Sequence, residues 1–220
     1  MDWQALALSL KLSLATMLVL VVLGMPLAYW LAFSKRRWKP IAEAIVALPL
    51  VLPPTVLGFY VLIALGPSSP LGAACERIFG HRLPFTFSGL LVASVLYSLP
   101  FAVQPFSAAF ASVDNRILEA SACSGAGRLK TFFRLVLPLS WAGVLTGLVL
   151  SFAHTLGEFG VVLMVGGNIP GSTRTVSIAI YDQVQSLDYA AAMRTSGLLL
   201  GISFVVLVLT YSLRKVRLFP

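Results

Sequence analysis

The sequence predicts an all-α polytopic membrane protein with five transmembrane helices. Hydrophobic residues make up 58% of its 220 residues and charged residues only 11%, whereas soluble domains are usually about a quarter charged. A helix that crosses a membrane needs about 20 apolar residues. Five stretches meet this requirement, at about 12–33, 41–65, 87–111, 139–165 and 195–213. Too few residues remain for a sizeable domain outside the membrane.

The distribution of basic residues predicts the orientation, because short cytoplasmic loops retain Lys and Arg. Eleven of the 16 basic residues follow the first, third or fifth stretch, and Arg217 is the last of them. We therefore expect the N-terminus outside and the C-terminus in the cytoplasm. This topology explains the net charge of +8 without nucleic acid. It also places Cys75 and Cys123 on opposite sides, where they cannot form a disulfide or share a metal.

The first stretch predicts a membrane anchor, with Tyr29, Trp30 and Phe33 at its inner boundary. Prolines interrupt the second and third stretches and leave backbone carbonyls without their helical partners. Such breaks persist in a membrane where protein or a wet cavity satisfies the backbone. Kinked packing helices would explain them, but two neighbouring broken spans favour a transport pathway. The residues concerned are Pro49, Pro53, Pro54, Ser98, Pro100, Gln104 and Pro105.

The fourth stretch carries small and polar residues on one helical face, spaced three or four apart. They are Gly143, Gly147, Ser151, His154 and Glu158, with Gly157 and Gly160 nearby. Small residues let helices approach closely in lipid, and a carboxylate at membrane depth should face protein or water. We expect Glu158 to form a hydrogen bond with His154. A structural or gating role is favoured over a proton relay.

The segment after the fourth stretch is expected on the outer side. Residues 166–175 are rich in turn formers, and residues 176–193 are too polar to span and predict an amphipathic or re-entrant element. The connection at 114–138 is polar and basic. In it, Asp114 can cap a short helix that Gly125 is suited to end, with a second short helix to about Leu137.

Catalytic chemistry is not indicated. The run from Gly125 to Thr131 contains glycines and a Lys-Thr pair, but Lys130 does not follow a glycine and no strand precedes it, so the P-loop pattern fails. The chain has two histidines, His81 and His154, and no plausible nucleophile, base or metal-ligand cluster. We expect no catalytic residue, no metal site and no cofactor in this chain.

The polar connection nevertheless carries a recognisable pattern. Glu119-Ala120-Ser121, three residues, Gly125, nine residues and Leu135-Val136-Leu137-Pro138 resemble the cytoplasmic coupling motif of ABC importer permeases. The alternative is a loop whose basic residues only set the topology. The resemblance covers residues 9–214 and implies the type I permease fold. Within the family, residues 48–60 and 156–175 look like those of molybdate permeases.

The resemblance implies the partners and the site residues. It implies a homodimer in the bacterial inner membrane, two cytoplasmic ABC ATPase subunits that bind ATP and Mg, and an extracytoplasmic molybdate-binding protein. The coupling residues would be Glu119, Ala120, Ser121, Gly125, Leu137 and Pro138. The pathway or gate residues would be Pro49, Pro53, Pro54, Gln104, His154, Gly157, Glu158 and Gly160.

The sequence departs from the family pattern at two of these positions. Ser121 stands for an alanine and is small enough to fit the same groove. His154 stands where relatives often have arginine, so a pair with Glu158 would be sensitive to pH, since histidine has an unperturbed pKa of about 6.5.

Other transporter classes remain as alternatives. A related permease for tungstate or sulfate belongs to the same class, and the stretch 168–171 argues against it without excluding it. A secondary transporter driven by an ion gradient would be built from repeated broken helices in corresponding halves, which five spans and one polar connection do not suggest. An intramembrane enzyme would need a catalytic cluster.

Overall fold

The computed structural model describes residues 2–215, which contain helices and no strand. The last predicted basic residue, Arg217, lies outside this range. Three helices are long and apolar enough to cross a membrane, and two bent helix pairs raise the number of candidate spans to at most five. The elements are α1 (Trp3–Phe33), α2 (Lys39–Val51), α3 (Pro54–Leu65), α4 (Pro70–Phe79), α5 (Phe87–Ala111), α6 (Asn115–Cys123), α7 (Arg128–Thr131), the π-helix η1 (Phe132–Val136), α8 (Leu137–Leu139), α9 (Trp141–Gly157), α10 (Gly160–Gly166), α11 (Val176–Gln185) and α12 (Tyr189–Lys215).

Helix α5 is the centre of the bundle and contacts α1, α2, α3, α9 and α10. Its buried residues Val103, Phe106 and Phe110 form one core with side chains of α1 and α9. The small residues predicted on the fourth stretch lie in this interface. A Cβ atom on Gly147 would come within 2.6 Å of the Phe106 ring, and one on Gly143 would collide with Ala109. Glycine therefore allows α9 to approach α5 closely.

The second predicted span is two helices joined by a sharp bend. The chain bends by 114° between α2 and α3. Pro53 lies between them in an extended conformation and Pro54 is the first residue of α3, a position where a missing N–H costs little. The fourth predicted span is also interrupted, because α9 ends at Gly157 and α10 begins at Gly160. The first and last predicted spans are longer than expected and begin at Trp3 and Tyr189.

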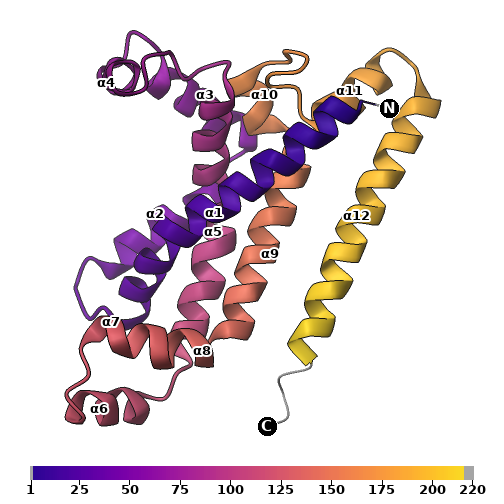
Figure 1. Ribbon diagram of the computed structural model, residues 1–220. Helices are drawn as coiled ribbons and strands as arrows, with labels where there is room; N and C mark the ends of the chain where they lie inside the picture. Colours follow the sequence, from indigo (N-terminus) through magenta and orange to yellow (C-terminus); the bar gives the residue numbers. More distant parts are fainter. Residues whose placement is uncertain (1, 216–220) are drawn as a thin grey trace.

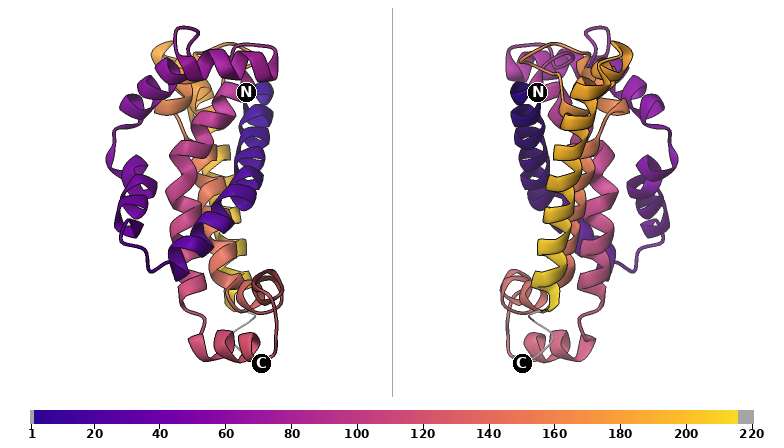
Figure 2. Two further views of the ribbon diagram at one scale, coloured as in Figure 1. Left: turned by 90° about the vertical axis from the view of Figure 1, so that its left-hand side faces the viewer. Right: turned by 90° about the vertical axis from the view of Figure 1, so that its right-hand side faces the viewer.

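The connections gather at two opposite ends of the bundle (Figure 1). Helices α4, α10 and α11 lie at the end where the chain starts, and α6, α7 and α8 lie at the other end, toward which α12 runs. Figure 2 shows that α2 and α3 stand on one side of the bundle. We call the two ends the N-terminal end and the α6 end. Cys75, in α4, and Cys123, in α6, lie at opposite ends, as the sequence predicts.

A polar network fastens the segment before α11 to the start of α1. The Arg174 side chain donates to Asn168 Oδ1 at 2.6 Å and lies 3.5 Å from Asp182 and 3.9 Å from Asp2. The Val176 N–H donates to the Ser9 hydroxyl at 2.8 Å. Helix α11 is therefore held at the N-terminal end as a short element that precedes α12. It is shorter than the element expected over 176–193, because it ends at Gln185 and the residues from Tyr189 onward belong to α12.

Candidate functional site

A cavity of about 580 Å³ lies at the break between α9 and α10 and is called here the break cavity. It lies between the start of α3, the middle of α5 and the broken fourth span. Five residues expected to form a pathway or gate line it: Pro54, His154, Gly157, Glu158 and Gly160. Thr55, Tyr97, Ala153, Phe159, Leu163 and Met164 complete the lining.

Glycine stands at the two positions of the break for different structural reasons. A Cβ atom on Gly160 would lie 2.7 Å from the Cβ of Pro54, so only glycine allows α10 to touch α3 at this point. A Cβ atom on Gly157 would have no neighbour within 4 Å, because Gly157 borders the open cavity. Between them, Glu158 adopts an extended conformation and ends α9. The helix thus breaks where it meets the cavity.

Glu158 is buried without a hydrogen-bonding partner. Its exposed fraction is 4%, and neither carboxylate oxygen has a hydrogen bond to a described residue. The Ser94 hydroxyl of α5 is likewise buried without a hydrogen bond to a described residue. The expected hydrogen bond between His154 and Glu158 is therefore wrong, because α9 ends before Glu158 and turns its side chain away from the helical face.

His154 is held by α5 instead. Its Nδ1 atom lies 2.9 Å from the Ser98 hydroxyl, and Ser98 lies 2.8 Å from the Thr155 hydroxyl. The imidazole ring stacks on Phe101 with 3.8 Å between centroids and lies 4.7 Å from the Tyr97 ring. The ring therefore has a fixed orientation on the wall of the break cavity.

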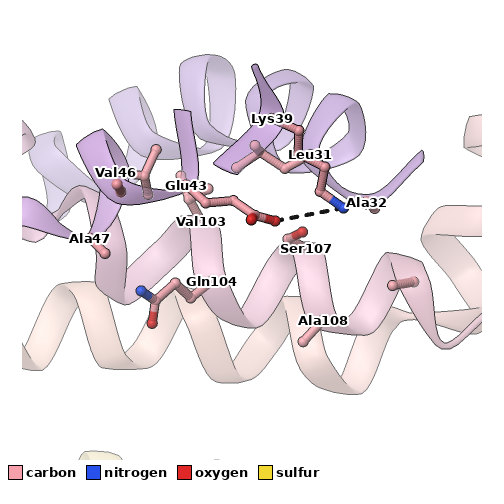
Figure 3. A pocket seen from close by; sticks show the side chains of 12 residues that line it. Leu31, Ala32, Lys39, Glu43, Val46, Ala47, Val103, Gln104, Ser107 and Ala108 are labelled. Carbon is pink, nitrogen blue, oxygen red and sulfur yellow. Dashed lines mark ion pairs between the residues drawn. The ribbon is translucent and has the colours of Figure 1, made fainter. Parts of the chain in front are cut away.

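A second cavity, of about 600 Å³, lies between α2 and α5 toward the α6 end and is called the α2–α5 cavity (Figure 3). Gln104 and Ser107 of α5 line it opposite α2. On α2, Lys39 and Glu43 form an ion pair of 3.6 Å at its edge. Gln104 is the expected pathway residue found here. Pro49 and Pro53 line neither cavity and lie at or near the bend between α2 and α3.

One face of α5 connects the two cavities. Tyr97 lines the break cavity and Gln104 lines the α2–α5 cavity. They are seven residues apart, which places them on the same face of a helix about 10 Å apart along its axis. Phe101 lies between them and stacks on His154. The face therefore carries an aromatic side chain between two open spaces.

The residues expected to couple the chain to an ATPase lie at the α6 end. Asp114 caps α6 by accepting from the Arg116 N–H at 2.9 Å, and Gly125 follows with a φ of 73°, as the sequence predicts. Helix α6 projects beyond the bundle (Figure 1). Glu119, Ala120 and Gly125 are exposed on it, and Glu119 forms no ion pair with any residue in 2–215.

One residue expected to couple, Ser121, and the extent of the second short helix differ from expectation. Ser121 is buried rather than presented to a groove, and its hydroxyl lies 2.8 Å from that of Thr131 in α7. It joins the two short helices. The second short helix extends to Leu139 and includes a π-helical segment, with Leu137 partly buried and Pro138 exposed.

Sequence reasoning named Ser98 among the polar and proline residues of the third span, but it missed Tyr97 and Thr155. The sequence does contain a pattern that could have found Tyr97, because Tyr97 and Gln104 share a helical face. Which helix His154 would face depends on packing between residues 56 positions apart, and no local pattern contains that information.

Comparison with known proteins identifies the family. Residues 21–218 match the family described as "Binding-protein-dependent transport system inner membrane component". The chain is 50% identical, over 98% of its length and 96% of the relative's, to the molybdenum transport system permease protein ModB of Azotobacter vinelandii. It is 36% identical to ModB of Escherichia coli K12, covering 84% of this chain and 81% of that protein.

Solved structures share the fold at low sequence identity. A chain of the MetNI methionine ABC transporter in an inward-facing conformation has a TM-score of 0.74 at 14% identity, covering 98% of this chain and 95% of that one. A chain of a bacterial ABC transporter that imports the acidic polysaccharide alginate has a TM-score of 0.73 at 18% identity, covering 100% and 82%. The chain thus has the fold of type I ABC importer permeases, and it belongs to the family of inner membrane components of binding-protein-dependent transport systems.

Proposed function

We propose that this chain is the permease subunit of an ATP-driven molybdate importer. The observation that carries the proposal is the 50% identity, over nearly the whole of both chains, with a molybdenum transport system permease. Molybdate is the oxyanion form in which such a system would take up molybdenum. The chain itself forms the pathway, and partner subunits bind ATP and Mg.

The pathway follows α5 between the two cavities. The break cavity and the α2–α5 cavity contain six of the eight expected pathway residues and share one face of α5. The oxyanion passes from the N-terminal end, through the break cavity and past Phe101, to the α2–α5 cavity. Pro49 and Pro53 contribute by setting the bend between α2 and α3.

The exposed segment α6 couples this pathway to ATP. Helix α6 projects from the bundle with Glu119 and Ala120 exposed, a shape that fits a groove on another protein. The partners are a second copy of this chain, two cytoplasmic ATPase subunits and an extracytoplasmic molybdate-binding protein. The α6 end then faces the cytoplasm, and the N-terminus lies outside.

Reconstitution tests the proposal. In proteoliposomes that contain the permease, its ATPase and its binding protein, labelled molybdate should accumulate only when ATP is supplied to the ATPase side. Tungstate should compete well and sulfate poorly. Relatives named as probable sulfate permeases are 30% identical to this chain, so sulfate is the relevant competitor. Strong competition by sulfate, with weak molybdate uptake, would assign the chain to sulfate import.

A further inference from the structure

We propose that the break cavity binds the transported oxyanion through a protonated His154, and that one proton is taken up with the anion and returned to water when the anion leaves. The inference rests on the proposed transport function and deepens it, since it assigns a ligand residue and a protonation state to the pathway.

A chain of hydrogen bonds fixes the position of the first His154 proton. Thr155 Oγ1 lies 2.9 Å from the Ser151 carbonyl oxygen, which can only accept, so the Thr155 hydroxyl donates its one proton there. The Thr155 oxygen must then accept from the Ser98 hydroxyl at 2.8 Å. The Ser98 proton is thereby used, and its oxygen accepts at 2.9 Å from His154 Nδ1–H.

This arrangement leaves Nε2 for the ligand. When His154 is neutral, its single ring proton is on Nδ1, and Nε2 is only an acceptor. Nε2 has no hydrogen bond to any residue that the structure describes. An oxyanion without protons offers only acceptor oxygens, so it cannot bind to this nitrogen. Protonation of Nε2 changes the same atom into a charged donor, and charge-assisted hydrogen bonds are the stronger kind.

The cavity offers no other positive charge. Its lining contains no lysine or arginine, and its other side-chain donors are the hydroxyls of Thr55 and Tyr97. Glu158 adds two unpaired carboxylate oxygens, which would repel the anion when ionised. Burial of an anion away from water needs a compensating charge. Among the residues that line the cavity, only His154 can become that charge.

The groups that face His154 do not supply a competing charge partner. Tyr97 of α5 and Glu158 are the other titratable groups on the wall, and Glu158 makes no hydrogen bond with the ring. Among the side chains that the structure describes, titratable groups on other helices packed against α9 have contacts elsewhere, apart from Tyr189 of α12, which is exposed. These are Asp2, Lys11 and Tyr29 of the α1 region, Tyr181 and Asp182 of α11, and Arg194 of α12.

The experiment compares uptake by the reconstituted complex from about pH 6 to about pH 8, with equal pH on both sides, because binding that takes up a proton weakens as the pH rises. His154→Gln is neutral throughout, and His154→Arg is positively charged throughout. His81→Gln is the matched control, because His81 is the other histidine of the chain and is exposed. Each variant is checked for recovery with the ATPase before assay.

We expect molybdate uptake by the wild type, divided by that of His154→Gln, to fall by up to about tenfold per pH unit from about pH 6 to about pH 8, because each bound anion requires the uptake of one proton. His154→Arg should keep uptake and lose this dependence. His81→Gln should follow the wild type. Any pH dependence that persists in His154→Arg belongs to the ATPase or the binding protein.

Two results would overturn the proposal. A wild-type to His154→Gln ratio that is constant with pH would show that the proton on His154 is not needed, and this ratio decides the matter even if His154→Arg fails to assemble. Absence of ATP-dependent molybdate uptake in the wild type at every pH would instead reject the proposed function, and this inference with it.

Discussion

The side chains at the break cavity show how a single backbone turn reassigns hydrogen-bonding partners. His154 and Glu158 are four residues apart and would share a face if the helix continued. Helix α9 ends at Gly157, so His154 bonds to Ser98 and Glu158 is left without a partner. His154 and Glu158 were predictable as site residues, because ionisable side chains are energetically costly inside a membrane. Their pairing was not, because it depends on one φ/ψ change.

Replacing Glu158 by glutamine tests whether its carboxylate serves stability or transport. Because the side chain is buried with both oxygens unpaired, and an unpaired buried carboxylate is destabilising, we expect Glu158→Gln to leave the melting temperature of the purified complex equal or higher. ATP-driven uptake should change. The exposed carboxylate Glu43 provides the control, since Glu43→Gln should alter stability by less than about 0.5 kcal/mol. A clear loss of stability in Glu158→Gln would indicate a structural role.

Gly160 and Gly157 form a matched pair for testing the contact between α3 and α10. Gly160→Ala places a methyl group 2.7 Å from Pro54, and such overpacking costs about 1–3 kcal/mol. Gly157→Ala meets nothing within 4 Å and should not destabilise the protein. Thermal unfolding of the two purified variants measures the difference. Equal melting temperatures would mean that α3 and α10 separate without cost.

At the scale of elements, α6, α7 and η1 behave as one unit attached to the α6 end. The Asp114 cap and the left-handed Gly125 bound α6, and the bond between Ser121 and Thr131 joins it to α7. Capping residues and glycine are local signals, so these bounds were predictable. The inward position of Ser121 was not, since it depends on how two short helices pack together.

Gly125→Val should weaken association with the ATPase while leaving the permease in the membrane. Gly125 has a φ of 73°, a conformation that costs an ordinary residue about 1–2 kcal/mol and a β-branched one more. Gly127→Ala is the control, because Gly127 has an ordinary φ of −67° and open space around it. Co-purification measures the effect. Full recovery of the ATPase and full uptake in Gly125→Val would leave the segment as a topology loop.

At the scale of the whole molecule, the helices alternate in direction and sort the connections between two ends. The upper count of candidate spans agrees with the five apolar stretches, and the prolines correctly predicted the interruption of the second span. The predicted interruption of the third span is wrong, because α5 continues from Phe87 to Ala111 through Pro100 and Pro105, and the fourth span breaks between Gly157 and Gly160 instead. The angle of 114° between α2 and α3 was beyond sequence reasoning, because a proline permits many bend angles and the packing of α3 on α10 selects one.

Cysteine labelling tests the orientation of this arrangement. Cys75 and Cys123 are free and lie at opposite ends. In single-cysteine variants on intact cells, a membrane-impermeant thiol reagent should reach Cys75 and not Cys123. Because Cys123 is exposed at the α6 end, it should react once the membrane is permeabilised. Reaction of Cys123 in intact cells would reverse the orientation.

The prolines of α5 have a mechanical consequence for the two cavities. Pro100 and Pro105 lie inside this helix and deprive the carbonyls of Leu96 and Phe101 of their usual N–H partners. We therefore expect α5 to bend most easily between Tyr97 and Gln104, where the break cavity meets the α2–α5 cavity, and a bend there would widen one cavity while it narrows the other. Replacing both prolines, Pro100→Ala and Pro105→Ala, should stiffen this part of α5, so that the reconstituted complex still hydrolyses ATP but takes up no molybdate. Undiminished molybdate uptake would show that the two halves of α5 move as one.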